Sequence, residues 1–579
     1  MSKNILRIGR VIEVSGAKVV GELETSIEDL YRTYKSRRYT VGQVGSIVKI
    51  ESGDKLVFGI VTALRMAEVA ITDKSANKKT VERIGDAKWL EIELFGEGLR
   101  TGIGEDDFIF QRGVVTYPLP SQGIFVTTIN ELSRIYHRPD KPSICVGSLS
   151  QASTLPVHLL TDELLGKHFA VLGTTGSGKS CSVTVLLKAI LDIAPKGHII
   201  LLDPHNEYGR AFSNNAEMID PTTLNLPHWL LNFEESIELF VGKTEHAATS
   251  QTNILKEAIL AARRKFGTLG ISKESITVDT PVPYKLSDLL ADVRSKKPTA
   301  AAAAAPYDKI IGKIEALQAD KRFSFLIRPD SDVADGLAGI IGNYLRIPVA
   351  DKPLSIIDLS GVPSDVVDVV VSVLCRMIFD FAIWSPRPVK VPILLVCEEA
   401  HRYAPRSDEA AFQPTKQALS RIAKEGRKYG VSLGLVSQRP SELDETILSQ
   451  CNTLIALRMS NEQDQHFVKR ALPDGVRSLV DVLPTLRAQE ALIVGEGTTV
   501  PVRVKFSDLP EDQRPHSADV PFACLWEKES TNEDYVTEVI RRWRQQERPA
   551  TEDVSFPSKI LPEIDNTEVS ATDNQSLAD

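Results

Sequence analysis

Short runs of hydrophobic residues alternate with polar and turn-forming residues from Ile5 to about Thr128. The runs are LRIGRVIEVSG, AKVVGELE, GQVGSIVKI, KLVFGIVTAL, KWLEIELFG and GVVTYPLP. Evenly spaced short strands with glycines between them are typical of a small antiparallel barrel or sandwich. These runs carry no catalytic constellation, so we expect the region to serve docking and assembly.

The pattern changes near Phe169, where a continuous apolar run replaces the alternation. Phe169 to Leu172 are typical of a buried parallel strand, and apolar residues at helical spacing follow. The helix positions are Val183, Leu186, Leu187, Ile190 and Leu191. Later strand-like runs span 198–203, 354–360, 392–399 and 431–438, and TLIALR and EALIVG extend the series. Strands that alternate with helices predict an α/β fold with a parallel-dominated sheet and helices on both faces.

The patterns divide the chain into three predicted regions. Residues 1–145 form an N-terminal β-barrel, 146–510 the α/β core, and 511–579 a C-terminal extension. A helical insertion interrupts the core at about 224–346, and its alanine run at 300–305 fits either a linker or a helix. The extension holds one amphipathic stretch, YVTEVIRRWRQQ, before a tail rich in Asp, Glu, Ser and Thr that we expect to be flexible.

Composition narrows the class of protein. The 579 residues are 42% hydrophobic and 25% charged, which is typical of a globular chain with a large core. The longest apolar region, 366–384, contains Asp368, Arg376 and Asp380, so it predicts a buried helix rather than a membrane span. The beginning MSKNILRIGRV lacks the apolar segment of a targeting sequence. We therefore expect a cytoplasmic protein with no membrane partner.

The cysteines and the net charge exclude fewer classes of protein than the hydrophobic content does. Six cysteines are scattered without a CxxC pair, which argues against a zinc knuckle or a disulfide framework. The formal net charge of −9 does not indicate a nucleic-acid binder. It does not exclude one, because an enzyme that holds DNA in a narrow channel needs positive charge only along that channel.

The segment between the first core strand and its helix matches the phosphate-loop pattern GxxxxGK[ST]. Its residues are Gly173, Thr174, Thr175, Gly176, Ser177, Gly178, Lys179, Ser180 and Cys181. The glycines permit tight turns, so that successive N–H groups and the helix N-terminus converge on a triphosphate. Lys179 would reach the β and γ phosphates, and the Ser180 hydroxyl would ligate Mg²⁺. The alternative is a glycine-rich loop that only turns a corner, but both flanks favour ATP and Mg²⁺ as cofactors.

Hydrolysis also needs carboxylates at the end of a neighbouring strand. The run PILLVCEE delivers Glu398 and Glu399 to such an end. We assign Glu398 to the Mg²⁺ environment and Glu399 to the base that polarises water. Asp203 and Gln438 also stand at strand ends, where the Gln438 amide could sense the γ phosphate through water. The alternatives are a charged helix start for the glutamates and a turn cap for Gln438.

Several long motifs, in the same order, resemble the HerA family of hexameric DNA translocases in the HerA and FtsK group. They are HFAVLGTTGSGKS, DPHNEY, the carboxylate strand with AHRYAP, RIAKEGRKYGVSLGLVSQRPSEL and LPEDQRPHSADVPFACLW. With the barrel, the resemblance covers nearly all of the chain and implies a RecA-like P-loop NTPase core. The chain differs from the usual family sequence at one position that bears on metal binding. The family usually has Asp before the second carboxylate, where this chain has Glu398, so the charge is kept and the geometry can differ.

The resemblance further implies a homo-hexamer with ATP between neighbours and double-stranded DNA through the centre. It makes Arg427 the candidate for an arginine that stabilises transition-state charge, either within a subunit or across an interface. The alternative for Arg427 is a solvated basic helix end, which the helix dipole favours. Basic clusters at 263–265 and 296–297 are equally compatible with solvated faces.

The leading functional prediction is an ATP hydrolase that acts as a hexameric DNA translocase or helicase motor. By resemblance, it would work with an effector in DNA end processing or anti-phage defence. That effector would be a NurA-like nuclease or a sirtuin-like NAD hydrolase. The alternatives are a ring-shaped ATPase scaffold that regulates a bound effector, and a protein-remodelling ring. The remodelling ring is disfavoured, because no separate substrate-recognition domain is visible beyond the barrel.

Overall fold

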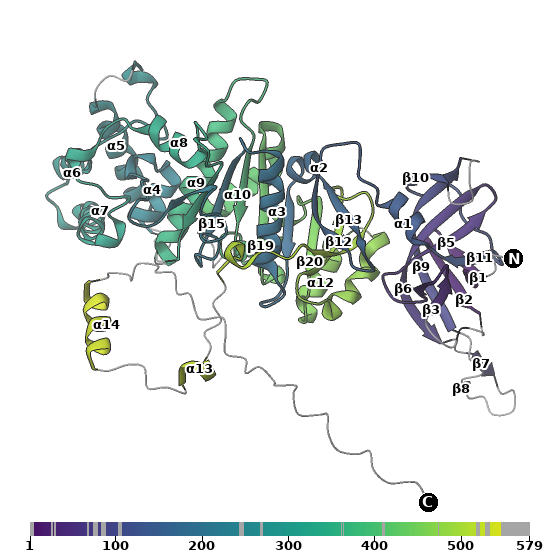
Figure 1. Cartoon of the computed structure of the whole chain (residues 1–579). Coiled ribbons are helices and arrows are strands. Elements are labelled where there is room, and N and C mark those ends of the chain that lie inside the picture. The colour runs from purple at the N-terminus through teal and green to yellow at the C-terminus, as the bar shows by residue number, and fades with distance from the viewer. Residues whose placement is uncertain are drawn as a thin grey trace, which may run out of the picture. The chain divides into compact units, whose positions relative to one another are not determined.

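The structure, a computed structural model, describes residues 5–545 apart from short stretches. The stretches are 25–26, 28–30, 67–68, 73–78, 83–87, 102–106, 243–247, 267–269, 361, 363, 408–411, 473, 517–521 and 527–532. The chain divides into two compact units, residues 1–516 and 517–579 (Figure 1). The tail that we expected to be flexible lies outside the described residues.

The first unit begins with a β-barrel. Its strands follow the order β10-β9-β2-β1-β11-β5-β6, and β6 also pairs with β9, which closes the sheet. Their bounds are β1 (Arg7–Ser15), β2 (Lys18–Leu23), β5 (Ile47–Ser52), β6 (Lys55–Met66), β9 (Lys88–Arg100), β10 (Phe108–Arg112) and β11 (Gly123–Val126). Two separate hairpins join β3 (Tyr31–Tyr34) to β4 (Arg37–Thr40) and β7 (Val69–Thr72) to β8 (Lys79–Glu82). The predicted barrel is confirmed.

One predicted strand of this region is wrong. The run GVVTYPLP, residues 113–120, forms no strand. Pro118 and Pro120 have no N–H to donate, and the Glu97 side chain accepts hydrogen bonds from the N–H groups of Val115 and Thr116. The donors that a sheet ladder would need are therefore missing or already bonded.

The core of the first unit is one mixed sheet. Its order is β13-β12-β22-β21-β20-β14-β19-β18-β15-β17-β16, and the strands from β20 to β16 are parallel. The bounds are β12 (Ser143–Leu149), β13 (Ala152–Leu160), β14 (Phe169–Leu172), β15 (His198–Asp203), β16 (Ala216–Ile219), β17 (Leu354–Asp358), β18 (Ile393–Cys397), β19 (Val431–Ser437), β20 (Thr453–Leu457), β21 (Glu490–Gly495) and β22 (Val502–Phe506). All the core strands that the sequence predicts are present.

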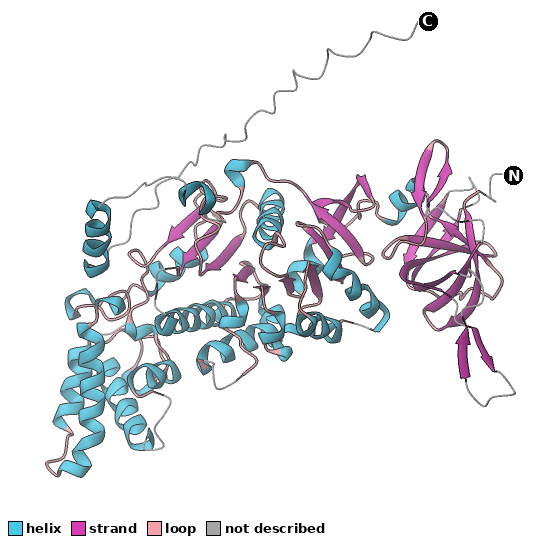
Figure 2. Ribbon diagram, turned by 90° about the horizontal axis from the view of Figure 1, so that it is seen from below, coloured by secondary structure: helices cyan, strands magenta, loops and turns pink. Residues whose placement is uncertain are grey.

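Helices cover both faces of this sheet (Figure 2). Phe169 and Val171 of β14 pack into the core that contains α3, whereas Ala170 and Leu172 pack into the core that contains α9 and α10. The helices of the core are α1 (Ile129–Ile135), α2 (Thr161–Gly166), α3 (Lys179–Ile193), α9 (Ser364–Trp384), α10 (Gln413–Tyr429), α11 (Glu445–Leu448) and α12 (Glu462–Ala471). Alternate residues of each buried strand thus serve opposite layers, which explains the continuous apolar runs.

The insertion between β16 and β17 is helical. It contains α4 (Phe233–Phe240), α5 (Ala248–Lys265), α6 (Leu286–Ser295), α7 (Ala301–Ala319) and α8 (Leu337–Leu345). The alanine run begins α7, so it is a helix and not a linker. Ile310 and Ile314 of this helix are fully buried against Leu255 and Leu289 of α5 and α6 in a shared apolar core.

The second unit contains α13 (Phe522–Trp526) and α14 (Glu533–Gln545). The predicted amphipathic stretch is thus helical, with Val536 and Trp543 both exposed. The predicted boundary between 145 and 146 falls inside β12, a strand of the core sheet. This boundary and the one between 510 and 511 stay predictions.

Candidate functional site

The phosphate loop joins β14 to α3 at the edge of the sheet where the parallel strands end. Gly176 and Gly178 have φ values of 72° and 87°, which glycine adopts without strain. A Cβ added at Gly173 would lie 2.8 Å from the Cβ of Leu457, so this position needs glycine as well. Helix α3 begins at Lys179 with no side-chain cap. Its first-turn N–H groups are therefore available to phosphate oxygens.

The side chain of Lys179 points to the paired carboxylates at the end of β18. Its Nζ lies 2.9 Å from Glu398 Oε1 and 3.8 Å from Glu399 Oε1, and all three side chains are buried. Burial lowers the pKa of Lys179, but the charges of Glu398 and Glu399 outweigh it and raise the pKa above its ordinary value. Burial raises the pKa of Glu398 to about 7, although Lys179 opposes this shift. The second oxygen of Glu398 accepts a hydrogen bond of 2.8 Å from the Tyr208 hydroxyl.

Glu399 has an unusual backbone and an unused oxygen. Its φ of 51° and ψ of 44° place a non-glycine residue in the left-handed region. Gln438 Nε2 donates a hydrogen bond to Glu399 Oε1. Oε2 is buried without a hydrogen bond among the described residues, although His401 Nδ1 lies 3.3 Å away. This oxygen is therefore available to accept a proton from a water molecule.

Gln438 connects the carboxylate to the phosphate loop. Its Oε1 accepts a hydrogen bond from the Thr175 hydroxyl, while its Nε2 bonds Glu399. Both ends of the amide are thus used, and its orientation follows from its partners. The structure brings Lys179, Glu398, Glu399 and Gln438 together in one cluster at the ends of β14, β18 and β19.

The loop after β15 adds residues that the sequence reasoning missed. The Asp203 carboxylate accepts hydrogen bonds from the N–H groups of His205 (3.2 Å) and Tyr208 (3.0 Å), so it orders its own loop. Burial raises the pKa of Asp203 to about 6. The ordered loop places Glu207 against the phosphate loop, where its Oε2 accepts a 2.5 Å hydrogen bond from the Ser180 hydroxyl. From the sequence, only the first residue of DPHNEY, Asp203, is predicted to stand at a strand end, and the position of Glu207 follows from the fold of the loop.

The other loop residues have structural contacts. Thr174 donates through its hydroxyl and its N–H to the carbonyl of Arg458, each at 3.0 Å. Ser177 is fully buried, and its Oγ has no hydrogen-bond partner in the part of the chain that the structure describes. Cys181 is half-buried, and burial raises the pKa of its thiol.

These groups fit a magnesium nucleotide. The uncapped turn of α3 and the Ser177 hydroxyl, which has no partner among the described residues, supply donors for phosphate oxygens, and Lys179 supplies the charge. Ser180, Glu398 and Glu207 supply oxygens of the kind that Mg²⁺ prefers, directly or through its water shell. Bound Mg²⁺ would neutralise phosphate charge during transfer.

Arg427 lies away from this cluster. It is exposed in the last turn of α10, which ends at Tyr429 immediately before β19 begins at Val431. Gln438 follows the other end of β19, and a strand of this length spans about 20 Å. Burial and then the charge of Arg427 lower the pKa of His168, which immediately precedes β14. Arg427 therefore stands at the edge where the strands begin, out of reach of the phosphate loop in the same subunit.

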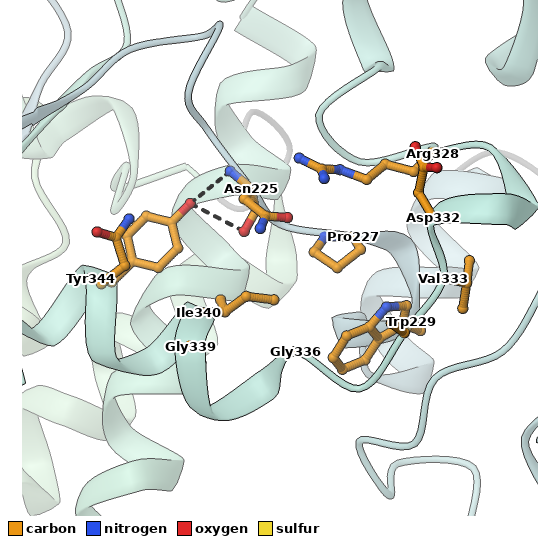
Figure 3. Close-up of a pocket in the computed structure, with 12 residues that line it drawn as sticks. Asn225, Pro227, Trp229, Arg328, Asp332, Val333, Gly336, Gly339, Ile340 and Tyr344 are labelled. Atoms are coloured by element: carbon orange, nitrogen blue, oxygen red, sulfur yellow. Dashed lines mark hydrogen bonds between the residues drawn. The ribbon is translucent and has the colours of Figure 1, made fainter. Parts of the chain in front are cut away.

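A separate pocket of about 380 Å³ lies in the helical insertion (Figure 3). The hydroxyl of Tyr344 accepts a 3.0 Å hydrogen bond from the Asn225 N–H, and it lies 3.3 Å from the Asn225 carbonyl. Trp229 and Arg328 also line this pocket. None of the predicted site residues does, so it is distinct from the cluster around Lys179.

The fold and the cluster define a P-loop ATPase, an enzyme that hydrolyses ATP. A family model described as "Helicase HerA, central domain" matches residues 144–378. A relative named DNA double-strand break repair helicase HerA, from Pyrococcus furiosus, is 30% identical over 80% of this chain and 87% of its own length. A relative of the same name from Sulfurisphaera tokodaii is 27% identical over 80% of this chain and 88% of its own length. The chain belongs to the HerA family.

Solved structures give more distant likenesses. VirB4 of Thermoanaerobacter pseudethanolicus has a TM-score of 0.45 at 15% identity, covering 65% of this chain and 99% of its own. The plasmid coupling protein TrwB, in complex with ADP and Mg²⁺, has a TM-score of 0.44 at 14% identity, covering 67% and 94%. Within the described residues, no helix has the length and apolar character needed to cross a membrane.

Proposed function

We propose that the chain is an ATP-dependent DNA translocase or helicase motor that works with an effector in DNA end processing or anti-phage defence. The observation that carries the proposal is the cluster of Lys179, Glu398, Glu399 and Gln438 at one edge of the parallel sheet. Membership of the HerA family, whose relatives are named as DNA repair helicases, supports DNA as the substrate.

Each residue of the cluster has a proposed role in hydrolysis. Lys179 and the first-turn N–H groups of α3 bind the β and γ phosphates, and Ser180 and Glu398 hold Mg²⁺. Glu399 accepts a proton from the attacking water at Oε2, the oxygen with no hydrogen bond from any described residue. Gln438 fixes Oε1 of the same carboxylate and reports on the γ phosphate through Thr175.

The position of Arg427 favours a ring of subunits. Because it stands at the opposite end of β19, a strand that spans about 20 Å, we propose that it stabilises transition-state charge on a nucleotide held by another copy. We therefore propose a cytoplasmic homo-hexamer with one ATP at each interface and double-stranded DNA in the central channel.

The second candidate function is a ring-shaped ATPase scaffold that assembles and regulates an effector, with DNA transport secondary. The exposed apolar side chains of Val115, Tyr117 and Leu119 on the barrel favour this function, and Val115 is 84% exposed. They support docking of an effector protein, such as a NurA-like nuclease or a sirtuin-like NAD hydrolase, on the barrel.

Movement along DNA distinguishes the two functions. With ATP and Mg²⁺, the parental protein should displace a triplex-forming oligonucleotide from duplex DNA, and DNA should stimulate ATP hydrolysis. Lys179→Ala should abolish both activities, because the loop loses its point charge on the β and γ phosphates. Lys313→Gln, on the exposed surface of α7, is the control and should behave as the parental protein. ATP hydrolysis that responds to an effector but never to DNA would favour the scaffold.

A further inference from the structure

A polar pocket of about 770 Å³ lies beside the phosphate loop. Segments that follow four neighbouring parallel strands, β14, β18, β19 and β20, contribute residues to it. Its lining includes Thr174, Arg406, Arg439, Ser441, Asn461 and Arg470, and we call it the arginine pocket. Of the phosphate loop the lining includes Thr174 alone; Lys179 and Ser180, the proposed ligands of the phosphates and of Mg²⁺, do not line the pocket.

Two guanidinium groups of the arginine pocket have no carboxylate partner among the described residues. They belong to Arg406 and Arg470, both exposed, and Arg470 lies over the ring of Phe467 at 5.8 Å from its centroid. Arg439 pairs with Glu442 at 2.9 Å, but exposed pairs of this kind contribute little and exchange easily. The pocket can therefore offer three guanidinium groups to an anion.

One of the two acidic residues in the lining, Asp464, is already satisfied by hydrogen bonds. Asp464 is buried, and its Oδ1 accepts hydrogen bonds from the Ser441 N–H at 3.0 Å and the Ser441 hydroxyl at 2.7 Å. These bonds orient the carboxylate toward Ser441 and hold the segment after β19 against α12. Asp464 thus acts as a support of the pocket wall, and the exposed arginines set its binding chemistry.

The lining matches a phosphodiester backbone better than a base. Guanidinium forks bind phosphate oxygens in a bidentate manner, and Ser and Asn side chains are common partners of phosphates and sugars. Of the two aromatic rings in the lining, Phe467 is buried, and the exposed His466 imidazole is a single small ring beside three guanidinium groups. A ligand of this pocket is therefore expected to be recognised by charge and backbone shape, without reading of sequence.

We propose that the arginine pocket of each subunit binds the phosphodiester backbone of double-stranded DNA, an inference that rests on the proposed motor function. A short path joins the pocket to hydrolysis. The Arg439 N–H donates to Ser437 Oγ at 3.1 Å, Ser437 Oγ contacts His401 Nδ1 at 3.2 Å, and His401 lies 3.3 Å from Glu399. Arg439 also directly follows Gln438. DNA held in the pocket can therefore influence the catalytic carboxylate.

The double variant Arg406→Gln and Arg470→Gln tests the proposal in the full-length protein. Arg439 stays intact, because it adjoins Gln438. DNA affinity is measured by fluorescence anisotropy with a labelled duplex and a non-hydrolysable ATP analogue over a series of salt concentrations. We expect affinity to fall at least tenfold, and the slope of log affinity against log salt to become shallower by about 2, since two phosphate contacts are lost. Lys313→Gln with Lys321→Gln removes two exposed charges from the insertion and is the matched control.

Two results would overturn the proposal. One is parental DNA affinity and parental salt slope in the double variant. The other is a loss of nucleotide affinity as large as the loss of DNA affinity, which would assign the pocket to the nucleotide. Failure of the motor function itself is recognised separately, because the parental protein would then neither displace the triplex-forming oligonucleotide nor show DNA-stimulated ATP hydrolysis.

Discussion

At the scale of single residues, Glu399 stands out by its backbone. A side-chain-bearing residue in the left-handed region costs on the order of 1–3 kcal/mol, and such strain persists only where the surrounding structure imposes it. The turn after β18 imposes it here, and Glu399 Oε2 has no hydrogen bond within the part of the chain that the structure describes. Strained residues of this kind cluster at active sites, which supports Glu399 as the base. Glu398 makes the shorter of the two ion pairs with Lys179.

The two glutamates should therefore respond differently to substitution. Glu399→Gln removes the base and keeps the shape, so nucleotide binding should persist while turnover falls roughly 10²-fold or more. Glu398→Gln removes the closest partner of Lys179, so it should mainly weaken Mg²⁺-dependent binding, and Glu398→Asp should stay near parental. Nucleotide affinity and turnover across a Mg²⁺ series decide the matter. If Glu398→Gln binds nucleotide tightly but does not hydrolyse it, and Glu399→Gln hydrolyses ATP at the normal rate, then Glu398 is the base and Glu399 belongs to the Mg²⁺ site.

Glu207 provides a second test at this scale. Glu207→Gln keeps a hydrogen-bond acceptor for Ser180 but removes a negative charge beside the metal position. We expect the Mg²⁺ concentration needed for half-maximal hydrolysis to rise severalfold, while the rate at saturating Mg²⁺ changes less. Glu274→Gln, an exposed glutamate of the insertion, is the control. An unchanged Mg²⁺ dependence would show that Glu207 only orients Ser180.

At the scale of elements, the sequence predicts most of what the structure contains. The strands of the parallel sheet are buried on both faces, so their continuous apolar runs identify them almost to the residue. Glu207 was missed because its position depends on how Asp203 folds the following loop, which no spacing rule describes. The wrong prediction at 113–120 has the same origin, since Glu97, which lies on β9, accepts hydrogen bonds from the backbone N–H groups of this run.

The helical insertion should lose stability in acid because of His228. Its Nε2 lies 2.9 Å from the Tyr284 carbonyl, and its Nδ1 is buried with no hydrogen-bond partner among the described residues. Burial lowers the pKa of His228 to about 4. As the pH falls, His228 takes up a proton in the unfolded chain near pH 6.5, but in the folded chain only near pH 4. The contribution of His228 to the free energy of unfolding is therefore fully present above pH 6.5 and is lost as the pH drops toward 4. Between pH 7.5 and 5.5 the loss should be roughly 1 kcal/mol.

Thermal unfolding at these two pH values measures this effect. His228→Gln keeps an N–H donor for the Tyr284 carbonyl and cannot titrate, so its pH dependence should be flatter than that of the parental protein. The quantity compared is the change in the unfolding temperature between the two pH values, not the unfolding temperature of the variant itself. Equal pH dependence in the two proteins would remove His228 as the cause.

At the scale of the whole molecule, the sheet separates two halves of one proposed active site. The phosphate loop lies where the parallel strands end, and Arg427 lies where they begin. A homo-oligomer in which neighbouring copies stack edge to edge brings the two halves together. This geometry favours action of Arg427 across an interface, a choice that the sequence left open.

Mixed rings test this arrangement. Arg427→Ala and Lys179→Ala subunits should each be inactive alone, but a mixture should recover part of the parental ATP hydrolysis, because some interfaces pair an intact loop with an intact arginine. Hexamers of each mixture are verified by native mass spectrometry. No recovery at any mixing ratio would assign Arg427 a structural role.

The separation of Arg427 from its own phosphate loop also has a kinetic consequence. Under the proposed arrangement, an isolated subunit holds no complete site, and an open arc of n subunits holds one site fewer than it has subunits. Specific activity should therefore vanish on dilution below the assembly threshold and rise with a high order in protein concentration. ATP hydrolysis by such a protein is self-limiting, since free subunits released from a ring cannot consume nucleotide.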